Sequence, residues 1–385
     1  MPMPTQPSFT VDGNQLTLVT EGPERLRMLL ELIRSATRTL RVLYYIYVDD
    51  DAGNAVRRAL IDAARRGVTV QLIVDGLGSE PAASNDFFDP LREAGVGVCR
   101  FVPRLGRRYL MRNHQKLALA DEERVLIGGF NIEDDYFQTA EQDGWRDLGL
   151  LVEGPAAARL VGYFDALAEW TRRPRASMRS LARTLHRWSE PLGTTRWLLG
   201  GPMQRLSPWA RVVKRDMQRA RTIDLIAAYF APSPAMLRRL DKAGRRGRVR
   251  LVLPSKLDHG AAIWAARFTY AGLLRKKVEI YEYQPTKLHT KLFVIDDVVH
   301  IGSANFDIRS MFLNLELMFR IADPTFAAYV RSYVDGEVAR SELITPELYK
   351  QRTGPWTRVK QFGAYFVMAV LDYNVTRRLN FGPRK

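Results

Sequence analysis

The chain has 385 residues, of which 46% are hydrophobic and 26% are charged. This composition is typical of a folded globular protein and excludes a long disordered or fibrous chain. Basic residues outnumber acidic ones by 58 to 42, and the resulting net charge of +16 favours a polyanionic partner, either nucleic acid or an anionic membrane surface. The single cysteine, Cys99, excludes a disulfide framework within the chain and is expected to be a small buried side chain.

The hydropathy of the chain gives no sign of a targeting or spanning segment. Residues 1–6 lack both the basic region and the apolar core of a signal peptide. No run of about 18 apolar residues occurs, so no membrane-spanning helix is predicted. We therefore expect the protein to stay in the cytoplasm or to lie, as a peripheral protein, on the cytoplasmic face of the cell membrane.

The first predicted elements form a strand–helix–strand unit. Residues 39–45 mix β-branched, aromatic and apolar side chains as a strand does, and residues 68–74 form a second run of this kind. Between them, Val56, Leu60 and Ala63 have helical spacing. Two strands joined by a helix are expected to be parallel.

The second half of the chain repeats this order. Residues 222–230 and 249–253 are strand-like, with a helix predicted around Met236. Equivalent positions are 183 residues apart at Thr39 and Thr222, and the interval shrinks slowly along the chain. Changes in loop length between two copies of one fold produce such a drift.

A basic segment connects the halves. Arginines recur there every fourth residue, with apolar residues on the opposite side of the helical projection, so an amphipathic helix starting near Pro174 is predicted. The arginines are Arg175, Arg179, Arg183 and Arg187, and the apolar residues are Met178, Leu181, Leu185 and Trp188. Two interpretations stay open: a solvated linker helix packed on the body, or a helix whose basic face contacts a membrane.

The C-terminal region contains a short apolar run. Residues 362–371 are almost wholly apolar, which is too short to span a bilayer but sufficient for an interfacial helix. Cations flank the run: Arg358 and Lys360 before it, and Arg377, Arg378, Arg384 and Lys385 after it. A buried terminal helix is the alternative, but the flanking cations favour membrane contact.

One short pattern, H-x-K-x4-D, occurs twice. It comprises His114, Lys116 and Asp121 in the first half, and His289, Lys291 and Asp296 in the second. Each copy continues through a hydrophobic run into a turn of small residues that contains an asparagine, Asn131 or Asn305. Because the copies share this continuation, the repeat is larger than the motif.

The residue types in this pattern suit the chemistry of a phosphodiester. A diester carries one negative charge and has a poor alkoxide leaving group, so its displacement needs a nucleophile, a proton donor and fixed positive charge. Two histidines with two lysines supply all three. Residues i and i+2 of a strand point the same way, so each histidine is expected to share a strand face with its lysine.

Other sites are not predicted. Lysines repel metal ions, and no cluster of ligands at metal-binding spacing is visible, so no metal or other cofactor is expected. His186, His259 and His300 lack the surrounding pattern and are expected to have no catalytic role.

The chain resembles the phospholipase D superfamily, and bacterial cardiolipin synthases most closely. The matching stretches are YYIYVDD at 44–50, RGVTV at 66–70, NH at 113–114, WRD at 145–147, LH at 288–289, NFDIRS at 305–310 and NLE at 314–316. The resemblance implies an α/β fold made of two copies, with two mixed β-sheets flanked by helices. The halves are expected to be related by a pseudo-two-fold axis, with one active site at their interface.

The resemblance also implies roles for the site residues. One imidazole attacks phosphorus to give a phosphohistidine while the other acts as acid and base, and His114 is favoured as the nucleophile. Lys116, Lys291, Asn131 and Asn305 would hold the phosphoryl oxygens, and the small residues Gly129 and Ser303 would let the backbone approach. Glu316 matches a position that accepts a hydrogen bond from a motif histidine, with Asp147 as its first-half counterpart. Asp121 and Asp296 are interpreted as structural supports.

Four segments are expected. They are a first half at residues 1–170, a basic amphipathic linker at 171–210, a second half at 211–345, and a basic and apolar tail at 346–385 that contacts the membrane.

The predicted function is a phosphatidyltransferase that makes cardiolipin from phosphatidylglycerol and a second phospholipid alcohol. Its partners would be an anionic phospholipid membrane and lipid substrates, with no obligatory nucleic acid and no protein partner. The enzyme alternatives are a lipid hydrolase that uses water as acceptor, and a phosphodiesterase that acts on nucleic acid. A catalytically inactive membrane scaffold is disfavoured because both motifs are intact.

Overall fold

The computed structural model describes residues 6–80, 82, 86–102, 111–173, 176–203, 206–257 and 260–371, with side chains described up to residue 369. Several residues discussed above lie outside the described part of the chain: the first five residues, Pro174, Arg175, His259 and the cations after residue 371.

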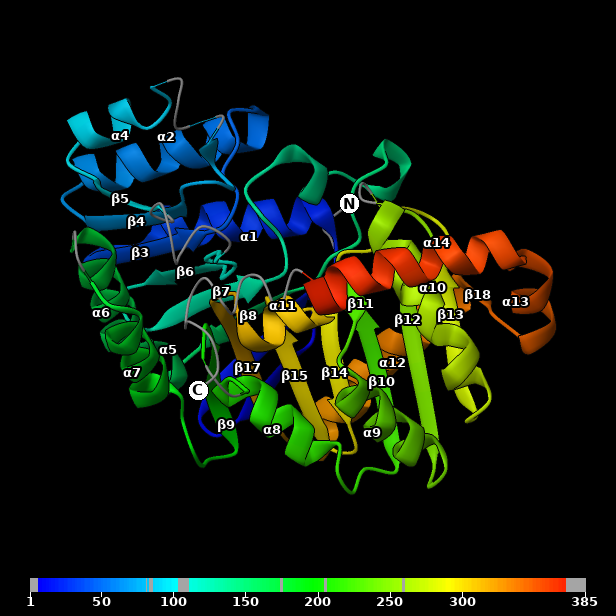
Figure 1. The fold of residues 1–385 in the computed structure, drawn as a ribbon. Helices are drawn as coiled ribbons and strands as arrows, with labels where there is room; N and C mark the ends of the chain where they lie inside the picture. The colour runs from blue at the N-terminus through cyan, green and yellow to red at the C-terminus, as the bar shows by residue number, and fades with distance from the viewer. Residues whose placement is uncertain are drawn as a thin grey trace.

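The first half forms a mixed eight-stranded sheet with the order β1-β2-β8-β7-β6-β3-β4-β5 (Figure 1). Its strands are β1 (Ser8–Val11), β2 (Asn14–Val19), β3 (Thr39–Tyr44), β4 (Thr69–Asp75), β5 (Gly97–Phe101), β6 (Leu117–Ala120), β7 (Arg124–Gly128) and β8 (Gly149–Glu153). The helices α1 (Gly22–Ser35), α2 (Asp51–Arg65) and α4 (Asp89–Glu93) accompany them. The predicted unit β3–α2–β4 is present and its strands are parallel.

The second half forms another mixed eight-stranded sheet, with the order β18-β13-β12-β10-β14-β15-β17-β9. Its strands are β9 (Thr195–Gly200), β10 (Thr222–Ala227), β12 (Arg248–Pro254), β13 (Val278–Tyr283), β14 (Lys291–Ile295), β15 (Val298–Gly302), β17 (Glu316–Ala322) and β18 (Ser341–Leu343). The helices are α8 (Pro208–Asp216), α9 (Pro234–Gly244), α10 (Gly260–Leu274) and α11 (Ile308–Phe312), and the short strands β11 (Phe230–Ala231) and β16 (Phe306–Asp307) pair in parallel.

The two sheets match strand for strand. The run β2-β8-β7-β6-β3-β4-β5 in the first sheet corresponds to β9-β17-β15-β14-β10-β12-β13 in the second, and β1 and β18 are additions at opposite ends. The second strand–helix–strand unit, β10–α9–β12, is parallel like the first. The prediction of a duplicated α/β fold with two mixed sheets is therefore confirmed.

The inner faces of the two sheets share one core. Alternate residues of each central strand enter it, so Leu119 of β6 and Val294 of β14 belong to the same buried cluster. Their neighbours Ala118 and Phe293 point the other way, into separate clusters beneath the helices. Figure 1 shows α1 and α2 over the first sheet, and α8 and α9 over the second. The halves therefore pack as one body around a common interior.

Several helices close the edges of this body. They are α5 (Pro155–Ala158), α6 (Val161–Arg172), α7 (Met178–Trp188) and α12 (Pro324–Ala339), with the short 3-10 turns η1 (Asp134–Tyr136) and η2 (Ala140–Gln142) between β7 and β8. Within the expected linker, α7 buries Leu181 and Leu185 in the shared core and leaves Arg179 and Arg183 exposed. The same range also contains β9, which pairs with β17 as an edge of the second sheet.

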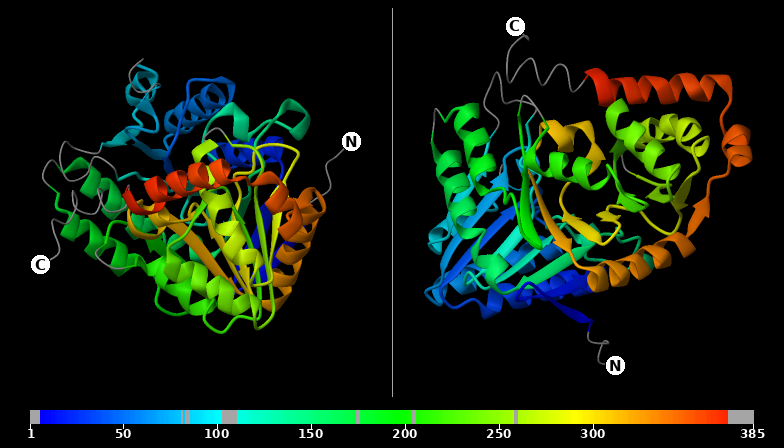
Figure 2. Two further views of the ribbon diagram at one scale, coloured as in Figure 1. Left: turned by 45° about the vertical axis from the view of Figure 1, so that its right-hand side comes forward. Right: turned by 90° about the horizontal axis from the view of Figure 1, so that it is seen from below.

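The C-terminal region is helical, comprising α13 (Pro346–Arg352), α14 (Pro355–Phe366) and the π-helical turn η3 (Val367–Leu371). Figure 2 shows α14 along the outside of the molecule, where it packs on α10. Tyr365 faces inward and donates to the carbonyl of Pro232 over 2.8 Å, whereas Trp356 and Phe362 are 81% and 53% exposed. Of the helices that the structure describes, none is both long and apolar enough to cross a bilayer.

Candidate active site

The H-x-K residues lie at the entrances to two equivalent strands. His114 and Lys116 precede β6, His289 precedes β14, and Lys291 is the first residue of β14. The prediction that each pair lies within a strand is therefore wrong for the first motif and half right for the second. The reason is that each histidine backbone bonds across to the other half of the molecule instead of continuing along its own sheet.

Two short backbone bridges make these connections. The amide of His114 donates to the carbonyl of Leu315 (2.9 Å), and the amide of Leu315 donates to the carbonyl of Arg112 (2.9 Å). In the second bridge, His289 donates to the carbonyl of Arg146 (2.7 Å). Each bridge therefore fixes one motif histidine against the residue that precedes an acidic side chain of the opposite half.

Those acidic side chains hold the imidazoles. Nδ1 of His114 lies 3.1 Å from Oε2 of Glu316, and Nδ1 of His289 lies 2.6 Å from Oδ2 of Asp147. A carboxylate can only accept, so each Nδ1 carries a proton and each Nε2 presents a lone pair. The two pairs are crossed, because each histidine is oriented by a carboxylate from the other half.

Gly129 and Ser303 lie behind these carboxylates. A Cβ on Gly129 would stand 2.5 Å from Oδ1 of Asp147, so only glycine leaves room for that carboxylate. At the equivalent position, the hydroxyl of Ser303 donates to Glu316. Neither residue lines the cavity described below. Both contact the carboxylates instead, which differs from their expected role of letting the backbone approach a ligand.

The motif lysines are buried behind the histidines. Nζ of Lys116 donates to the carbonyl of His114 (2.7 Å), and Nζ of Lys291 donates to the carbonyl of His289 and lies 2.7 Å from its Nδ1. Burial lowers the pKa of Lys291 to about 8, although Asp147 and Glu316 oppose the change. Burial and the charge of Lys291 lower the pKa of Lys116 well below its ordinary value. Because both pKa values are lowered, the positive charge of the two lysines depends on the groups that lie beside them.

The imidazoles are also shifted. Burial, reinforced by Lys116, lowers the pKa of His114 to about 4 against the opposing effect of Glu316. Burial and Lys291 lower the pKa of His289 to about 3. Both imidazoles are therefore neutral at pH 7 in the free protein. Asp147 remains ionised, because Lys291 and His289 outweigh its burial and keep its pKa below the usual range.

Asp121 and Asp296 stand at the far ends of β6 and β14, away from the histidines. The carboxylate of Asp121 accepts from the amides of Thr37, Arg38 and Thr39 over 2.7–3.0 Å. The carboxylate of Asp296 accepts from the amides of Arg221 and Thr222 in the same way. Each aspartate thereby ties the start of the neighbouring antiparallel strand, β3 or β10, to its motif strand.

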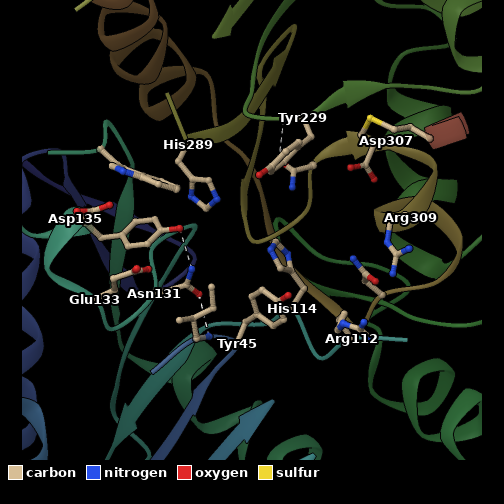
Figure 3. Close-up of a pocket in the computed structure, with 16 residues that line it drawn as sticks. Tyr45, Arg112, His114, Asn131, Glu133, Asp135, Tyr229, His289, Asp307 and Arg309 are labelled. Carbon is tan, nitrogen blue, oxygen red and sulfur yellow. Dashed lines mark hydrogen bonds between the residues drawn. The ribbon is translucent and has the colours of Figure 1, made fainter. Parts of the chain in front are cut away.

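A cavity of about 520 Å³ opens between the halves, and both histidines line it (Figure 3). Asn131 and Asn305 line it as well, and the side-chain oxygen of each accepts from the backbone amide of Ile46 or Tyr229 over 3.3 Å. The structure therefore gathers the two histidines and the two asparagines on one surface. His300 of β15, in contrast, pairs with Asp216 of α8 over 2.8 Å and does not line the cavity.

Several cavity residues were given no role in the sequence analysis. Tyr45 lies 5.1 Å from His114 between ring centroids, and Tyr136 and Trp145 lie 5.1 and 5.4 Å from His289. The remaining lining residues are Ile46, Arg112, Glu133, Asp135, Tyr229, Asp307, Arg309, Asn314 and Met368. Ile46 and Tyr229 follow β3 and β10 at equivalent positions, because their amides bind the equivalent asparagines, so the repeat itself could have revealed them.

A buried arginine organises one side of the cavity. Arg25 of α1 donates to the backbone carbonyls of Tyr136 (2.7 Å), Trp145 (3.1 Å) and Asp147 (2.6 Å). Its contacts thus fix the backbone of three residues that surround His289. No signal in the sequence distinguished Arg25 from the other arginines of an amphipathic helix.

The donor set of the site is rich in nitrogen. Within the part of the chain that the structure describes, no group of three or more His, Cys, Asp or Glu side chains is arranged to hold a metal ion.

Comparison with known proteins defines the class to which this fold and site belong. The family model described as "Cardiolipin synthase, PLD-like domain" matches residues 29–168 and 213–337, one stretch in each half. Among solved structures, the fold is similar to phosphatidylserine synthase from Haemophilus influenzae Rd KW20, with a TM-score of 0.73, 14% identity and 97% of each chain covered. It is also similar to polyphosphate kinase from Porphyromonas gingivalis, with a TM-score of 0.60, 15% identity, and 94% of this chain and 53% of that chain covered.

Curated relatives narrow the class to a family. The major cardiolipin synthase ClsA of Bacillus subtilis (strain 168) is 31% identical over 366 residues, which cover 92% of this chain and 74% of the relative. Cardiolipin synthase of Listeria monocytogenes serotype 4a (strain HCC23) is 30% identical, with 92% and 75% covered. The chain belongs to the cardiolipin synthase family of phospholipase D-like proteins.

Proposed function

We propose that this protein is a phosphatidyltransferase that forms cardiolipin by moving a phosphatidyl group from phosphatidylglycerol to the hydroxyl of a second phospholipid. Membership of the cardiolipin synthase family supports the substrate class. The observation that carries the chemistry is the pair of neutral imidazoles from opposite halves, each held through Nδ1 by a carboxylate, at one cavity.

The reaction needs two displacements at phosphorus. In the first, Nε2 of one histidine forms a P–N bond, the P–O bond to the glycerol head group breaks, and the other imidazole, in its protonated form, gives its proton to the departing oxygen. In the second, the acceptor hydroxyl forms a P–O bond, the P–N bond breaks, and the hydroxyl proton passes to the imidazole that had lost one. The product is cardiolipin and the histidines return to their starting states.

The acid in the first step must be protonated although both histidines have a low pKa in the free protein. A phosphodiester anion bound beside them would offset the charge of Lys116 and Lys291, which lowers both histidine pKa values. Substrate binding therefore favours proton uptake by one imidazole, and the two groups titrate as a coupled pair.

A nucleic-acid substrate fits the cavity less well. Glu133 and Asp135 line one side of it and would repel the successive phosphates of a polynucleotide strand. A single phosphodiester on a small head group avoids this repulsion, because it needs only the centre of the cavity.

Contact with a membrane follows from the same proposal, since both substrates are lipids. The exposed apolar side chains of α14 form a stripe with cations beside it: Trp356, Val359, Phe362 and Phe366, with Arg358 and Lys360. The stripe leads toward Met368 of η3, which lines the cavity. An anionic bilayer would satisfy both the apolar and the basic surface.

The decisive experiment supplies purified full-length protein with phosphatidylglycerol vesicles and identifies the lipid products by mass spectrometry. We expect cardiolipin and free glycerol in equal amounts, and activity that survives EDTA. Addition of phosphatidylethanolamine would show whether a second phospholipid competes as the phosphatidyl donor, because its ethanolamine head group has no hydroxyl that could act as acceptor. Phosphatidic acid as the main product would replace the transferase with a hydrolase.

The same assay tests the two histidines. His114→Ala and His289→Ala should each lower turnover to near background, because nucleophile and acid act as one unit. Acid-quenched protein should carry a phosphatidyl adduct on one histidine. Near wild-type activity in either variant, or an adduct on a lysine, would contradict the mechanism.

A further inference from the structure

One pair of equivalent positions in the two halves carries opposite charge in the cavity. Asp135 lies four residues after Asn131, and Arg309 lies four residues after Asn305, and all four residues line the same cavity. Figure 3 shows Glu133 and Asp135 on one side of the histidines, with Arg112 and Arg309 on the opposite side. The duplicated fold therefore provides a pocket whose two lobes differ in chemistry.

Backbone contacts hold the two arginines close together although they come from different halves. The carbonyl of Arg309 accepts from the amide of Asn314 (2.9 Å), and the carbonyl of Arg112 accepts from the amide of Leu315 (2.9 Å). Asn314 and Leu315 are consecutive residues, so a single segment fixes both arginine backbones. The amide of Asn113, next to Arg112, donates to the buried carboxylate of Asp75 (2.7 Å). This hydrogen bond further fixes the backbone beside Arg112.

Tyr45 connects Arg112 and Arg309 to the reacting centre. The ring of Tyr45 packs edge-on against His114, and Arg112 donates to its hydroxyl. Burial raises the pKa of the Tyr45 hydroxyl, and the nearby charges of Arg112 and Arg309 oppose this rise. Both guanidinium groups thus lie one side chain away from an imidazole that would contact the phosphodiester.

Asn314 adds an unused polar atom to the same lobe. Its side chain lines the cavity and is 8% exposed, and its Oδ1 has no hydrogen-bond partner among the described residues. A buried acceptor without a partner is costly, which points to a ligand that donates a hydrogen bond. A hydroxyl group next to an anion would satisfy both Asn314 and the arginines.

One carboxylate, Asp307, also faces this lobe. It caps α11 by accepting from the amide of Ser310 (2.7 Å), and burial raises its pKa to about 6, so it is still mostly ionised at pH 7. The lobe therefore contains two guanidinium groups against one carboxylate. Among the described lining residues, the opposite lobe contains Glu133 and Asp135 and neither arginine.

We propose that Arg112, Arg309 and Asn314 form the acceptor subsite, in which the arginines bind the phosphate of the acceptor phospholipid and Asn314 accepts from its glycerol hydroxyl. This inference rests on the proposed function. The second displacement brings two phosphates to either side of one glycerol, and their repulsion must be offset where the acceptor binds. Arginine suits this task because its planar fork can bind two phosphate oxygens at once.

The test presents two acceptors in one bilayer. Vesicles contain phosphatidylglycerol, which is both donor and phosphate-bearing acceptor, and monoacylglycerol, which offers the same glycerol hydroxyls without a phosphate. Mass spectrometry then gives the ratio of cardiolipin to the phosphatidyl product of monoacylglycerol. Because both products arise from the same active molecules, partial unfolding of a variant does not change this ratio.

Arg309→Gln and Arg112→Gln should each lower the ratio by about tenfold or more, since hydrogen bonds between charged groups are among the stronger ones in proteins. Arg309→Lys, which keeps the charge, should restore part of it. The control is Arg92→Gln, which removes an exposed arginine paired with Asp89 on α4 and should leave the ratio unchanged.

A wild-type ratio in both glutamine variants would overturn the acceptor subsite, whatever their total rate. Equal losses of both products would do the same, because the arginines would then act on the donor or on the fold. If the wild-type protein transferred to monoacylglycerol but made no cardiolipin, the proposed function itself would fail and the subsite with it.

Discussion

Gly129 and Ser303 show how single residues adapt one fold to two different acids. In the first half the short side chain is Asp147, and glycine leaves the space that its carboxylate fills. In the second half the longer Glu316 accepts from the Ser303 hydroxyl, which also accepts from the amide of Leu317 over 3.0 Å. The small residue and the acid therefore form matched pairs that orient His289 and His114.

Gly129→Ala should lower activity by about 10-fold to 100-fold, because the new methyl group would displace the carboxylate that orients His289. Ser303→Ala is the matched control. It removes the hydrogen bonds to Glu316 and from the amide of Leu317 without adding a clash, so its loss of activity should be smaller. Initial rates of cardiolipin formation, together with thermal unfolding to confirm the fold, measure both. Full activity in Gly129→Ala would show that this contact does not position the histidine.

Lys291 predicts an alkaline limit to activity. Its pKa is lowered to about 8, so the free protein loses this positive charge, and with it affinity for the diester anion, as pH rises through that value. We expect kcat/KM to fall above about pH 8. Lys291→Arg should move the fall to higher pH, because guanidinium stays protonated there. Identical pH profiles for the two proteins would assign the fall to another group.

Among the elements, α14 and α7 present different surfaces. The outer side of α14 is apolar, with Trp356 and Phe362 exposed, whereas α7 shows Arg179 and Arg183 to solvent while its apolar side packs into the shared core. Burial of apolar side chains in a bilayer is insensitive to salt, and attraction of arginine to anionic lipid is screened by it.

Serine substitutions of Trp356 and Phe362 should therefore weaken vesicle binding most clearly at high salt, since each fully buried side chain contributes about 2 kcal/mol. Glutamate substitutions of Arg179 and Arg183 should weaken binding mainly at low salt, by about 1 kcal/mol per charge. Co-sedimentation with phosphatidylglycerol vesicles over a salt series separates the two effects. Unchanged binding of the serine variant at high salt would mean that α14 does not enter the bilayer.

At the scale of the whole molecule, the halves are joined by buried charge as well as by the shared core. Arg146 lies beside Asp147 in the first half, and its Nη2 and Nε donate to Glu337 of α12 over 2.6 and 3.0 Å. Glu337 is fully buried. The contact locks the crossed arrangement of histidines and carboxylates, because it fixes one half against the other next to the site.

Glu337→Ala should reduce the free energy of unfolding by about 3–5 kcal/mol, because it leaves the buried guanidinium of Arg146 without its principal partner. Asp89→Ala breaks the exposed pair with Arg92 and should change stability by about 0.5 kcal/mol or less. Urea unfolding of both variants gives the comparison. A loss in Glu337→Ala no larger than that in Asp89→Ala would show that the pair does not hold the halves together.

Much of this architecture was predictable from the sequence. The duplicated H-x-K-x4-D pattern, the strand–helix–strand units and the drifting interval between halves depend on local periodicity and repetition, which a single chain displays directly. For the same reason, the contrast between Gly129 with Asp147 and Ser303 with Glu316 was visible as a difference between repeats.

The tertiary structure alone decided which groups meet. In the structure, His114 pairs with Glu316 of the other half, and each motif histidine lies just before its strand. These features, and the contacts of Arg25, depend on how two sheets pack face to face. The clustering of Arg112 with Arg309 likewise comes from one segment that binds both backbones. Such contacts join residues from 111 to 202 positions apart and leave no periodic trace, because the packing of distant surfaces determines them and local sequence does not.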